Sequence, residues 1–340
     1  MAKAEQAGAP WPGALAVSGG GDSLALMTLA AEWAQRHGRA APTVLTVDHG
    51  LQLGSTGDAH HVAARARAIG LEAHILCWQG PKPSSDIEAA ARVARYDLLG
   101  AWCCTHNVSG LYLAHTLDDQ AETFLLRLAR GSGLDGLAAM RELSALPSLV
   151  WNSVILVRPL LGERRETLRR FLESRGEKWL DDPMNRDPRF ARTRLRSAWP
   201  ALEACGLSPP RIAAAAAHLG RAREALEEDA RALLSRACRF DGSSAVVDAG
   251  AIGGAPAEIG LRCLAFILTA VAGRVYRPRF ERLERLYSAV FTSAGSITAR
   301  TLHGCRIGPA PRAQAFFGPR TVKFTREAPR NRRGGDSCKN

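Results

Sequence analysis

The sequence lacks the marks of a membrane, secreted or metal-cluster protein. Its 340 residues contain no apolar run long enough to span a bilayer, and the opening MAKAEQAGAPWPG lacks the continuous apolar segment and cleavage site of a secretory signal. The eight cysteines are scattered and form no CxxC pair, so the sequence predicts neither a disulfide framework nor a zinc site. We therefore expect a soluble cytoplasmic protein with reduced thiols and no membrane association.

Negative charge is scarce relative to positive charge. Asp and Glu number 33 against 45 Lys and Arg, which gives a formal net charge of +12. A field of this sign attracts polyanions and steers their approach, so it favours nucleic acid as a partner. A ribosome-adjacent role, a membrane-surface role or a genome that favours Arg over Lys is compatible with the same charge.

The chain is longer than one compact core usually organises, which predicts two domains. In its first part, short apolar runs alternate with segments of helical periodicity. The expected strands cover 14–18, 43–48, 71–78 and 110–115, and the expected helices cover 22–38, 56–69, 86–102 and 117–130. This alternation predicts an α/β fold: a parallel twisted sheet with helices on both faces and ligands at the carboxyl ends of the strands.

The first expected strand ends in a loop of small residues, SGGGDS. Three glycines permit positive φ and close backbone approach, so N–H groups can converge on an anion beside the positive end of the next helix. The alternative is a turn in which Asp22 or Ser23 only caps that helix. The loop is neither a Walker A loop nor GxGxxG, because the required spacing is missing. Its candidate ATP-binding residues are Ser18, Gly19, Gly20, Gly21, Asp22 and Ser23.

SGGGDS resembles the SGGxDS motif of the PP-loop ATP pyrophosphatases, which binds the pyrophosphate of ATP. Further segments are similar, in order, to the signature segments of tRNA(Ile)-lysidine synthases. These are TVDHGLQ (46–52), LAHTLDDQAETFLLRLARGSGLDGLAAM (113–140), RPLL (158–161) and WLDDPMNRDPRFARTRLR (179–196). The resemblance covers about residues 14–200. It departs at Gln52, where the family usually has Arg, so it implies no phosphate contact there.

This resemblance implies an enzyme that ligates lysine to the wobble cytidine of tRNA(Ile) with a CAU anticodon. The C2 oxygen of the cytidine attacks the α-phosphate of ATP and pyrophosphate leaves; the ε-amine of free L-lysine then attacks C2 and expels AMP. ATP is the implied co-substrate, and Mg²⁺ normally accompanies a nucleoside triphosphate. Asp22 and Asp119 are the candidate Mg²⁺ ligands.

AHTLDDQAET places polar groups at the end of the fourth strand and in the first turn of the next helix. Residues three and four apart share a helix face, so His115 can meet Asp119, and Asp118 can meet Glu122. Asp118, Asp119 and Glu122 are candidates for binding lysine, while His115 and Asp119 join Asp22 as catalytic candidates. Which of these groups takes the lysine proton stays open, and acids at a helix start also complement its dipole.

Two neighbouring segments supply further candidates. Asp48 ends the 43–48 strand, where a carboxylate can meet ribose hydroxyls or the cytidine, and His49 beside it is undecided. In SDIEAAARVARYDLL, Arg92 and Arg95 lie three apart on one helix face, and ordinary salt bridging explains Arg92 as well. The family pattern AR..RY implies that Arg95 points to nucleotide or tRNA phosphate. Arg95 is therefore a catalytic candidate, and both arginines are tRNA-binding candidates.

The segment around RFARTRLR predicts a basic helix face suited to an RNA backbone, delivered by the rigid loop DDPMNRDP. Its tRNA-binding candidates are Arg189, Arg192, Arg194 and Arg196, and a solvated charged helix is the alternative.

Five regions follow from these patterns. They are a flexible N-terminus (1–13), a PP-loop ATP-binding catalytic domain (14–204), a small, mainly helical tRNA-binding domain (205–295), a short β-rich extension (296–325) and a disordered basic tail (326–340). Two other functions remain open. A PP-loop enzyme of the 2-thiolation type would usually show a CxxC pair, and a noncatalytic RNA-binding module would leave the polar cluster at 115–122 unexplained. A homodimer is one candidate oligomeric state.

Overall fold

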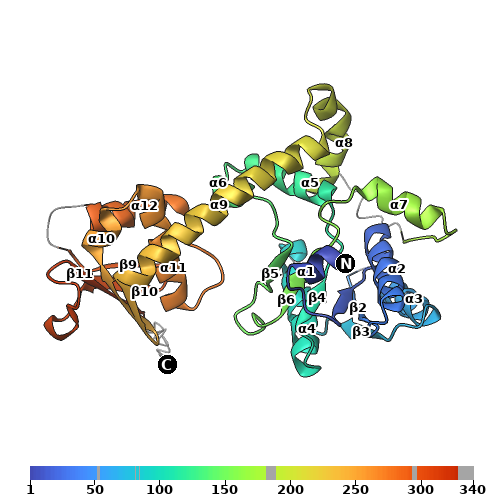
Figure 1. Cartoon of the computed structure of the whole chain (residues 1–340), viewed down its shortest axis with the longest axis horizontal. Helices are drawn as coiled ribbons and strands as arrows, with labels where there is room; N and C mark the ends of the chain where they lie inside the picture. Colours follow the sequence, from blue (N-terminus) through green and yellow to red (C-terminus); the bar gives the residue numbers. More distant parts are fainter. Residues whose placement is uncertain (52–53, 81, 84, 181–188, 293–296, 328–340) are drawn as a thin grey trace, which may run out of the picture. The chain divides into compact units, whose positions relative to one another are not determined.

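The computed structural model describes residues 1–340 except 52–53, 81, 84, 181–188, 293–296 and 328–340 (Figure 1). The chain divides into two compact units, residues 1–223 and 224–340. The boundary expected at 204/205 lies instead at 223/224, because α8 (Ala191–Ala204) and the first half of α9 (Pro209–Ala237) belong to the first unit. No helix in the described part of the chain has the length and apolar character needed to cross a membrane.

The first unit is built on a six-stranded sheet in the order β3-β2-β1-β4-β6-β5. Five strands are parallel, and β5 pairs antiparallel with β6 at one edge. The strands are β1 (Ala14–Ala16), β2 (Thr43–Asp48), β3 (Ala73–Cys77), β4 (Gly110–Tyr112), β5 (Leu143–Ala145) and β6 (Ile155–Val157). Because β1 pairs with both β2 and β4, the carboxyl ends of these three strands lie together at one edge.

Helices cover both faces of this sheet because successive side chains of a strand point to opposite sides. On β1, Leu15 packs with side chains of α2 and α3, whereas Ala14 packs with Tyr96 and Leu99 of α4. The helices of the unit, besides α8 and the start of α9, are α1 (Ala2–Gln6), α2 (Gly21–Arg36), α3 (Ser55–Ala68), α4 (Ile87–Thr105), α5 (Leu117–Leu128), α6 (Leu134–Leu137) and α7 (Arg165–Glu173). The predicted α/β fold with a parallel sheet is confirmed.

The N-terminal residues, expected to be flexible, are folded against the first unit. Residues 2–6 form α1, and the side chains of Ala4 and Ala9 are buried in the same apolar cluster as α2. The ring of Trp11 meets that of Trp33 edge to face, with 4.9 Å between centroids. The expectation is corrected because these apolar side chains give the segment a place in the core.

The second unit combines helices with a five-stranded antiparallel sheet in the order β7-β8-β11-β10-β9. Its strands are β7 (Cys238–Asp241), β8 (Ser244–Asp248), β9 (Arg300–Leu302), β10 (Cys305–Pro309) and β11 (Thr321–Arg326). Its helices, besides the end of α9, are α10 (Ala249–Gly253), α11 (Ala257–Ala272), α12 (Phe280–Tyr287), a π-helical turn (Ser288–Thr292) and a 3₁₀ turn (Arg312–Gln314).

Two predictions for this region are corrected by the structure. The β-rich residues 296–325 are not a separate extension, because β11 pairs with β8 through Val322 and Val247 and so completes one sheet. Arg326, expected to begin a disordered tail, is the last residue of β11, and residues 328–340 of that expected tail lie outside the described residues.

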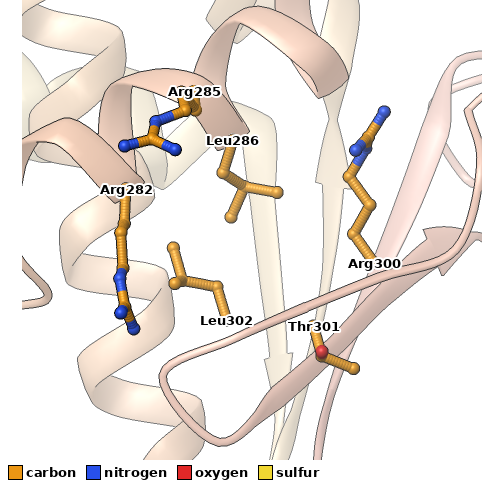
Figure 2. A pocket seen from close by; sticks show the side chains of 6 residues that line it. All are labelled: Arg282, Arg285, Leu286, Arg300, Thr301 and Leu302. Atoms are coloured by element: carbon orange, nitrogen blue, oxygen red, sulfur yellow. The ribbon is translucent and has the colours of Figure 1, made fainter.

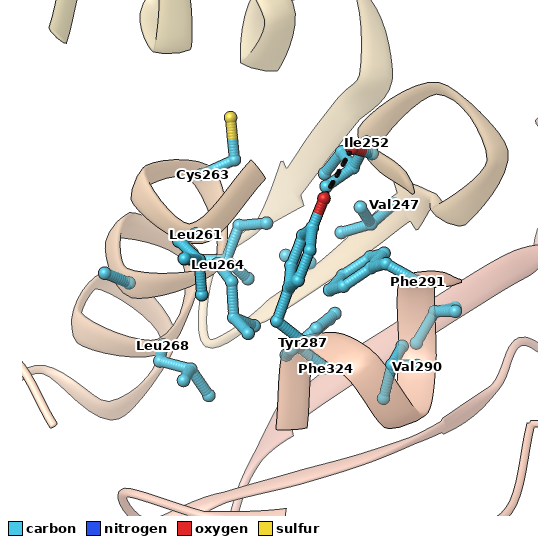
Figure 3. Close-up of a cluster of buried hydrophobic side chains, with 14 of the residues drawn as sticks. Val247, Ile252, Leu261, Cys263, Leu264, Leu268, Tyr287, Val290, Phe291 and Phe324 are labelled. Carbon is cyan, nitrogen blue, oxygen red and sulfur yellow. Dashed lines mark hydrogen bonds between the residues drawn. The ribbon is translucent and has the colours of Figure 1, made fainter. Parts of the chain in front are cut away.

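The second unit has an apolar core of its own, formed by side chains between Ala230 and Phe324. Figure 3 shows Tyr287 in this core beside Phe291, with 5.5 Å between ring centroids, and its hydroxyl donates a hydrogen bond to the carbonyl of Ile252 at 3.4 Å. A Cβ at Gly260 would stand 2.4 Å from the Tyr287 ring, so α11 reaches this close only because that position is glycine.

Candidate active site

The SGGGDS loop joins β1 to α2 and leads directly into the first turn of the helix. Gly19 has φ of +87°, and a Cβ there would lie 2.6 Å from Leu180, so both the backbone conformation and the space require glycine. The Ser23 hydroxyl accepts a hydrogen bond from the Ser18 N–H at 3.2 Å and donates one to the Gly20 carbonyl at 2.8 Å. Ser23 therefore holds the loop closed, whereas Ser18 is exposed.

This loop opens into a cavity of about 680 Å³ at the carboxyl edge of the sheet. The parallel strands β1, β2 and β4 all end there, which is where such folds bind ligands. Candidates from four segments line the cavity: Ser18, Gly20, Gly21, Asp22, Ser23, Arg95, His115, Asp119 and Arg196. The structure thus brings together groups that lie more than 170 positions apart in the sequence.

Arg165, at the start of α7, connects three of the candidate carboxylates. Its guanidinium donates to Asp22 at 3.0 Å, to Asp119 at 2.9 Å and to Glu122 at 3.0 Å. Arg165 was not among the residues predicted from the sequence, although it follows closely on RPLL. Burial works against a charged guanidinium, but the three carboxylates outweigh it and raise the pKa of Arg165. Arg165 therefore remains a cation that fixes the acidic groups relative to one another.

The two candidate metal ligands differ in how many of their oxygens are occupied. Asp22 Oδ2 accepts the bond from Arg165, while Asp22 Oδ1 is buried and has no hydrogen-bond partner among the described residues. Burial raises the pKa of Asp22, although Arg165 opposes the rise. Asp119 accepts bonds at both oxygens, from Arg165 and from Thr116. Burial alone would raise the pKa of Asp119, but Arg165 and the Thr116 bonds hold it below its usual value.

Asp118 binds the start of α7. Its Oδ2 accepts the backbone N–H of Arg165 at 2.7 Å, and the Arg164 guanidinium lies 3.2 Å from Oδ1. Both carboxylate oxygens of this lysine-binding candidate are thus used to dock a helix. A carboxylate at a helix N-terminus satisfies a free N–H and complements the dipole.

His115 lies at the end of β4 beside the cavity, and its Nδ1 has no hydrogen-bond partner among the described residues. Burial lowers the pKa of His115 to about 4, despite the opposing charge of Asp119, and nearby arginines add to the lowering. The imidazole is therefore neutral at pH 7 and able to accept a proton or a hydrogen bond.

Asp48 faces its own loop. Its oxygens accept hydrogen bonds from Ser55 and Thr56, both at 2.6 Å, and from the Gly50 N–H at 3.0 Å. The hydroxyl bonds lower the pKa of Asp48, and its side chain does not line the cavity. His49, left undecided by the sequence, does line it, and burial with the charge of Arg95 lowers the pKa of His49.

The two candidate arginines of α4 have different surroundings. Arg95 lines the cavity and is largely buried, which lowers its pKa from the usual value. Arg92 is exposed and donates to the Tyr96 hydroxyl at 3.3 Å, with its guanidinium 5.0 Å from the ring centroid. Only Arg95 is positioned to meet a ligand in the cavity.

The arginines of the predicted basic face of α8 also have different surroundings. Arg196 enters the cavity and donates to both oxygens of the fully buried Glu122, at 2.7 and 3.1 Å. Arg192 is exposed and lies close enough to His115 to lower its pKa. Arg194 donates to the Arg189 carbonyl at 2.8 Å, and neither of these two lines the cavity. Glu122 is thus already neutralised by Arg165 and Arg196.

Besides Arg165, the cavity-lining residues that were not predicted include Trp179, Leu180 and Arg169. Trp179 lies over Gly21, where a Cβ would be 3.4 Å from the indole, and the Leu180 N–H donates to the Gly19 carbonyl at 3.0 Å. Arg169 lies 5.8 Å from the Trp179 ring. These residues cover one side of the glycine loop. Gln52 and the DDPMNRDP loop (181–188) lie outside the described residues.

Among the described residues, no group of three or more His, Cys, Asp or Glu is arranged to hold a metal ion by itself. Mg²⁺ usually takes one or two carboxylates and completes its coordination with phosphates and water. Asp22 fits that requirement through its unpartnered Oδ1, whereas both oxygens of Asp119 already accept hydrogen bonds.

The first unit has the features of a PP-loop ATP-binding domain: a parallel sheet, a glycine loop at the end of a strand and a helix that begins directly after the loop. The family model described as a PP-loop domain matches residues 12–202. Relatives named tRNA(Ile)-lysidine synthase narrow the class. The Ruegeria pomeroyi protein is 40% identical over 293 residues (86% of this chain, 68% of that protein). A Bradyrhizobium protein is 40% identical over 325 residues (87% and 89%), and a Methylobacterium protein 42% identical over 293 residues (83% and 82%). The chain belongs to the tRNA(Ile)-lysidine synthase family.

The chain spans about two thirds of the Ruegeria relative and nearly nine tenths of the Bradyrhizobium one. Among solved structures, it is similar to a U34-tRNA thiolase from Methanococcus maripaludis, at 20% identity and a TM-score of 0.48, over 63% of this chain and 72% of that one. That likeness is too distant to bear on the reaction.

Proposed function

We propose that this protein is an ATP-dependent ligase that joins lysine to C2 of the wobble cytidine in tRNA(Ile) with a CAU anticodon. Cytidine O2 attacks the α-phosphate of ATP and releases pyrophosphate; the lysine ε-nitrogen then attacks C2, and the C2–O bond breaks to release AMP. The single observation that carries the proposal is that the glycine loop opens into one cavity lined also by Arg95, His115 and the ion pairs of Arg165 with Asp22 and Asp119.

The ATP site is formed by the loop of residues 18–23. Backbone N–H groups at the start of α2 are positioned to receive the β- and γ-phosphates, where charge grows as pyrophosphate leaves. Asp22 Oδ1 would hold Mg²⁺, which when bound supplies positive charge to the phosphates. Asp48 takes no direct part in this proposal, because its oxygens support the loop that precedes α3.

Arg95 and His115 flank the place where the cytidine must meet the α-phosphate. A buried guanidinium suits phosphate because it donates two hydrogen bonds in a fixed plane. His115 is the better proton acceptor for the lysine ammonium among the candidates, since it is neutral and its Nδ1 is unbonded, whereas Asp118, Asp119 and Glu122 all accept bonds from α7 or α8.

We assign lysine binding to Asp119, which lines the cavity, and to Glu122, which is buried one turn further along α5 and shares Arg165 with it. Because Arg165 and Arg196 already neutralise them, the ammonium group of lysine must share or replace one of these contacts. Asp118 acts through α7 and is a positioning residue. Arg92, Arg189, Arg192 and Arg194 remain candidates for tRNA contact outside the cavity. A cytoplasmic location and a homodimer remain predictions.

Lysine-dependent AMP release tests this function. Full-length protein is incubated with ATP, Mg²⁺ and a tRNA(Ile) transcript with a CAU anticodon, with lysine added or replaced by arginine. We expect AMP in proportion to labelled lysine joined to the tRNA, and none when the wobble cytidine is changed to uridine. A transfer of sulfur, or tRNA binding without AMP, would favour the two alternatives instead.

A further inference from the structure

A small pocket in the second unit is rimmed by three arginines. It measures about 230 Å³ and lies between α12 and β9 (Figure 2). Arg282, Arg285 and Leu286 come from one side of α12, because residues three and four apart share a helix face. Arg300 and Leu302 come from β9. None of the candidate active-site residues lies in this unit.

The fold makes little use of these three guanidinium groups. Arg285 donates only to the Glu281 backbone carbonyl, at 3.3 Å, and all three side chains are exposed. Within the described residues, the guanidinium groups of Arg282 and Arg300 have no hydrogen bond or ion pair. Three positive groups around one hollow repel each other, so an anion bound among them would be stabilised by all three.

The surrounding sequence strengthens this field. Between residues 274 and 326 there are eleven Lys or Arg and only two acids, Glu281 and Glu284. Glu281 and Glu284 alternate with Arg282 and Arg285 along α12, so the excess comes from the residues on either side of this helix. An excess of this size resembles the basic footprint of a polyanion-binding surface.

The pocket floor indicates which kind of anion fits. Leu286 is 6% exposed, and in Figure 2 it lies with Leu302 between Arg282 and Arg300. Apolar carbon beside guanidinium groups suits a phosphate attached to a sugar better than a free phosphate ion. Small-molecule sites usually measure about 300–1,000 Å³, so the 230 Å³ found here suits a single backbone unit.

We propose that Arg282, Arg285 and Arg300, over Leu286 and Leu302, bind one ribose-phosphate of the tRNA backbone. The proposal rests on the proposed function, which supplies the tRNA. Among the described residues, the pocket lining offers three guanidinium groups and the Thr301 hydroxyl, and no carboxylate or amide. We assign the guanidinium groups to backbone phosphate, a contact that contributes affinity and does not contribute to the choice of tRNA.

The test compares two full-length double variants of equal charge. Arg282→Gln with Arg300→Gln removes two pocket charges, and Arg231→Gln with Arg236→Gln removes two exposed charges from α9, outside the basic region of residues 274–326. Binding of a fluorescein-labelled tRNA(Ile) transcript is measured from 50 to 200 mM NaCl. We expect the pocket variant to bind about tenfold more weakly, with a log–log salt slope shallower by about two, and the matched variant to stay within about twofold of wild type.

Two further readouts decide the assignment. The preference for tRNA(Ile) over the methionine tRNA stays unchanged in the pocket variant, as does kcat for AMP release at saturating tRNA. Equal tRNA affinity of the two double variants would overturn the proposal. Competition by inorganic phosphate at constant ionic strength, lost in the pocket variant, would assign the pocket to a free anion and overturn it as well. Failure of the proposed function looks different, because wild-type protein would then release no lysine-dependent AMP.

Discussion

Asp22 has one paired and one unpaired carboxylate oxygen in the middle of the candidate active site. Asp22→Asn keeps the size of the side chain and removes the charge at Oδ1, where a phosphate-bound cation would be held. We expect pyrophosphate release to fall by about 10²–10³ while tRNA affinity changes less than about twofold. The measurement is pyrophosphate release at saturating ATP, with tRNA binding followed in parallel.

Glu166→Gln is the matched control for this change. Glu166 is an exposed carboxylate on α7 whose ion pair with Arg170 stays within that helix, so its loss removes the same charge without touching the cavity. Activity of this variant should match wild type. Pyrophosphate release that survives in Asp22→Asn would show that the charge of Asp22 is not part of the ATP site.

His115 gives the folded protein a pH dependence of defined sign. Burial lowers its folded pKa to about 4, below the ordinary 6.5, so between these values the unfolded chain takes up a proton that the native state refuses. As the pH falls from 6.5 towards 4, His115 therefore lowers the free energy of unfolding. Above pH 6.5 it makes no pH-dependent contribution to that free energy. Between pH 7.5 and 5, His115→Asn should lose about 2 kcal/mol less unfolding free energy than wild type, as measured by urea titration.

The exposed His60 on α3 provides the control for that titration. His60→Asn removes an imidazole of the same kind from a solvated position. Its stability should follow wild type across this pH range. If the unfolding free energies of wild type and His115→Asn depend on pH in the same way, His115 is not desolvated in solution.

The sequence could predict residues whose chemistry is local to a motif. Ser18 to Ser23, His115 and Asp119 lie next to strand ends, and a strand end fixes which edge of the sheet they reach. Arg165 could not be assigned in this way, because its role depends on α7 lying across from α2 and α5, more than 40 positions away from each acid that it binds. The same limit explains why Asp48 was expected in the cavity, while Ser55 and Thr56 turn it towards its own loop.

At the scale of elements, α7 is fixed through its N-terminus. Asp118→Ala removes the acceptor of the Arg165 N–H and the partner of Arg164. We expect a loss of about 1–2 kcal/mol in unfolding free energy and faster amide exchange in α7. KM for lysine should also rise, because Arg165 would no longer hold Asp119 and Glu122 in place. Hydrogen-exchange mass spectrometry and steady-state kinetics measure these effects.

Glu173→Ala is the control for this change, because it removes a carboxylate from α7 itself and leaves the contact of Asp118 on α5 with the start of α7 in place. Glu173 is exposed at the other end of the same helix, so its removal should leave exchange and KM near wild type. Unchanged exchange in Asp118→Ala would show that packing of Leu168 and Leu172 alone holds the helix.

Elements with strong periodicity were predictable, and short edge elements were not. The four parallel strands β1 to β4 carry β-branched or buried apolar runs, and each is followed by a helix of at least 12 residues. Strands β5 and β6 have three residues each, as β1 and β4 do, but neither is followed by a helix of 12 or more residues that would mark a strand–helix–strand unit. In the second unit, strands were expected at 296–325, but the pairing of β11 with β8 joins segments more than 70 positions apart, which no local pattern predicts.

At the scale of the whole molecule, the described residues form separate cores. The cluster of the second unit draws on residues 230–324, and the two clusters beside the six-stranded sheet draw on residues 4–172. Because the two units share no described core residue, each unit can unfold in a separate transition. A ligand that binds only the folded first unit should then stabilise one transition and leave the other in place.

ATP provides that ligand, because the cavity and the glycine loop both lie in the first unit. At an ATP concentration about one hundredfold above Kd, the first unit should gain about 2.7 kcal/mol, which raises its melting temperature by roughly 5–10 °C. Differential scanning calorimetry of the full chain measures both transitions, and AMP at the same concentration should shift the first one less, since it lacks the phosphates that the loop receives. If both transitions rise together, the two units unfold cooperatively, and separate cores do not imply separate stability in this protein.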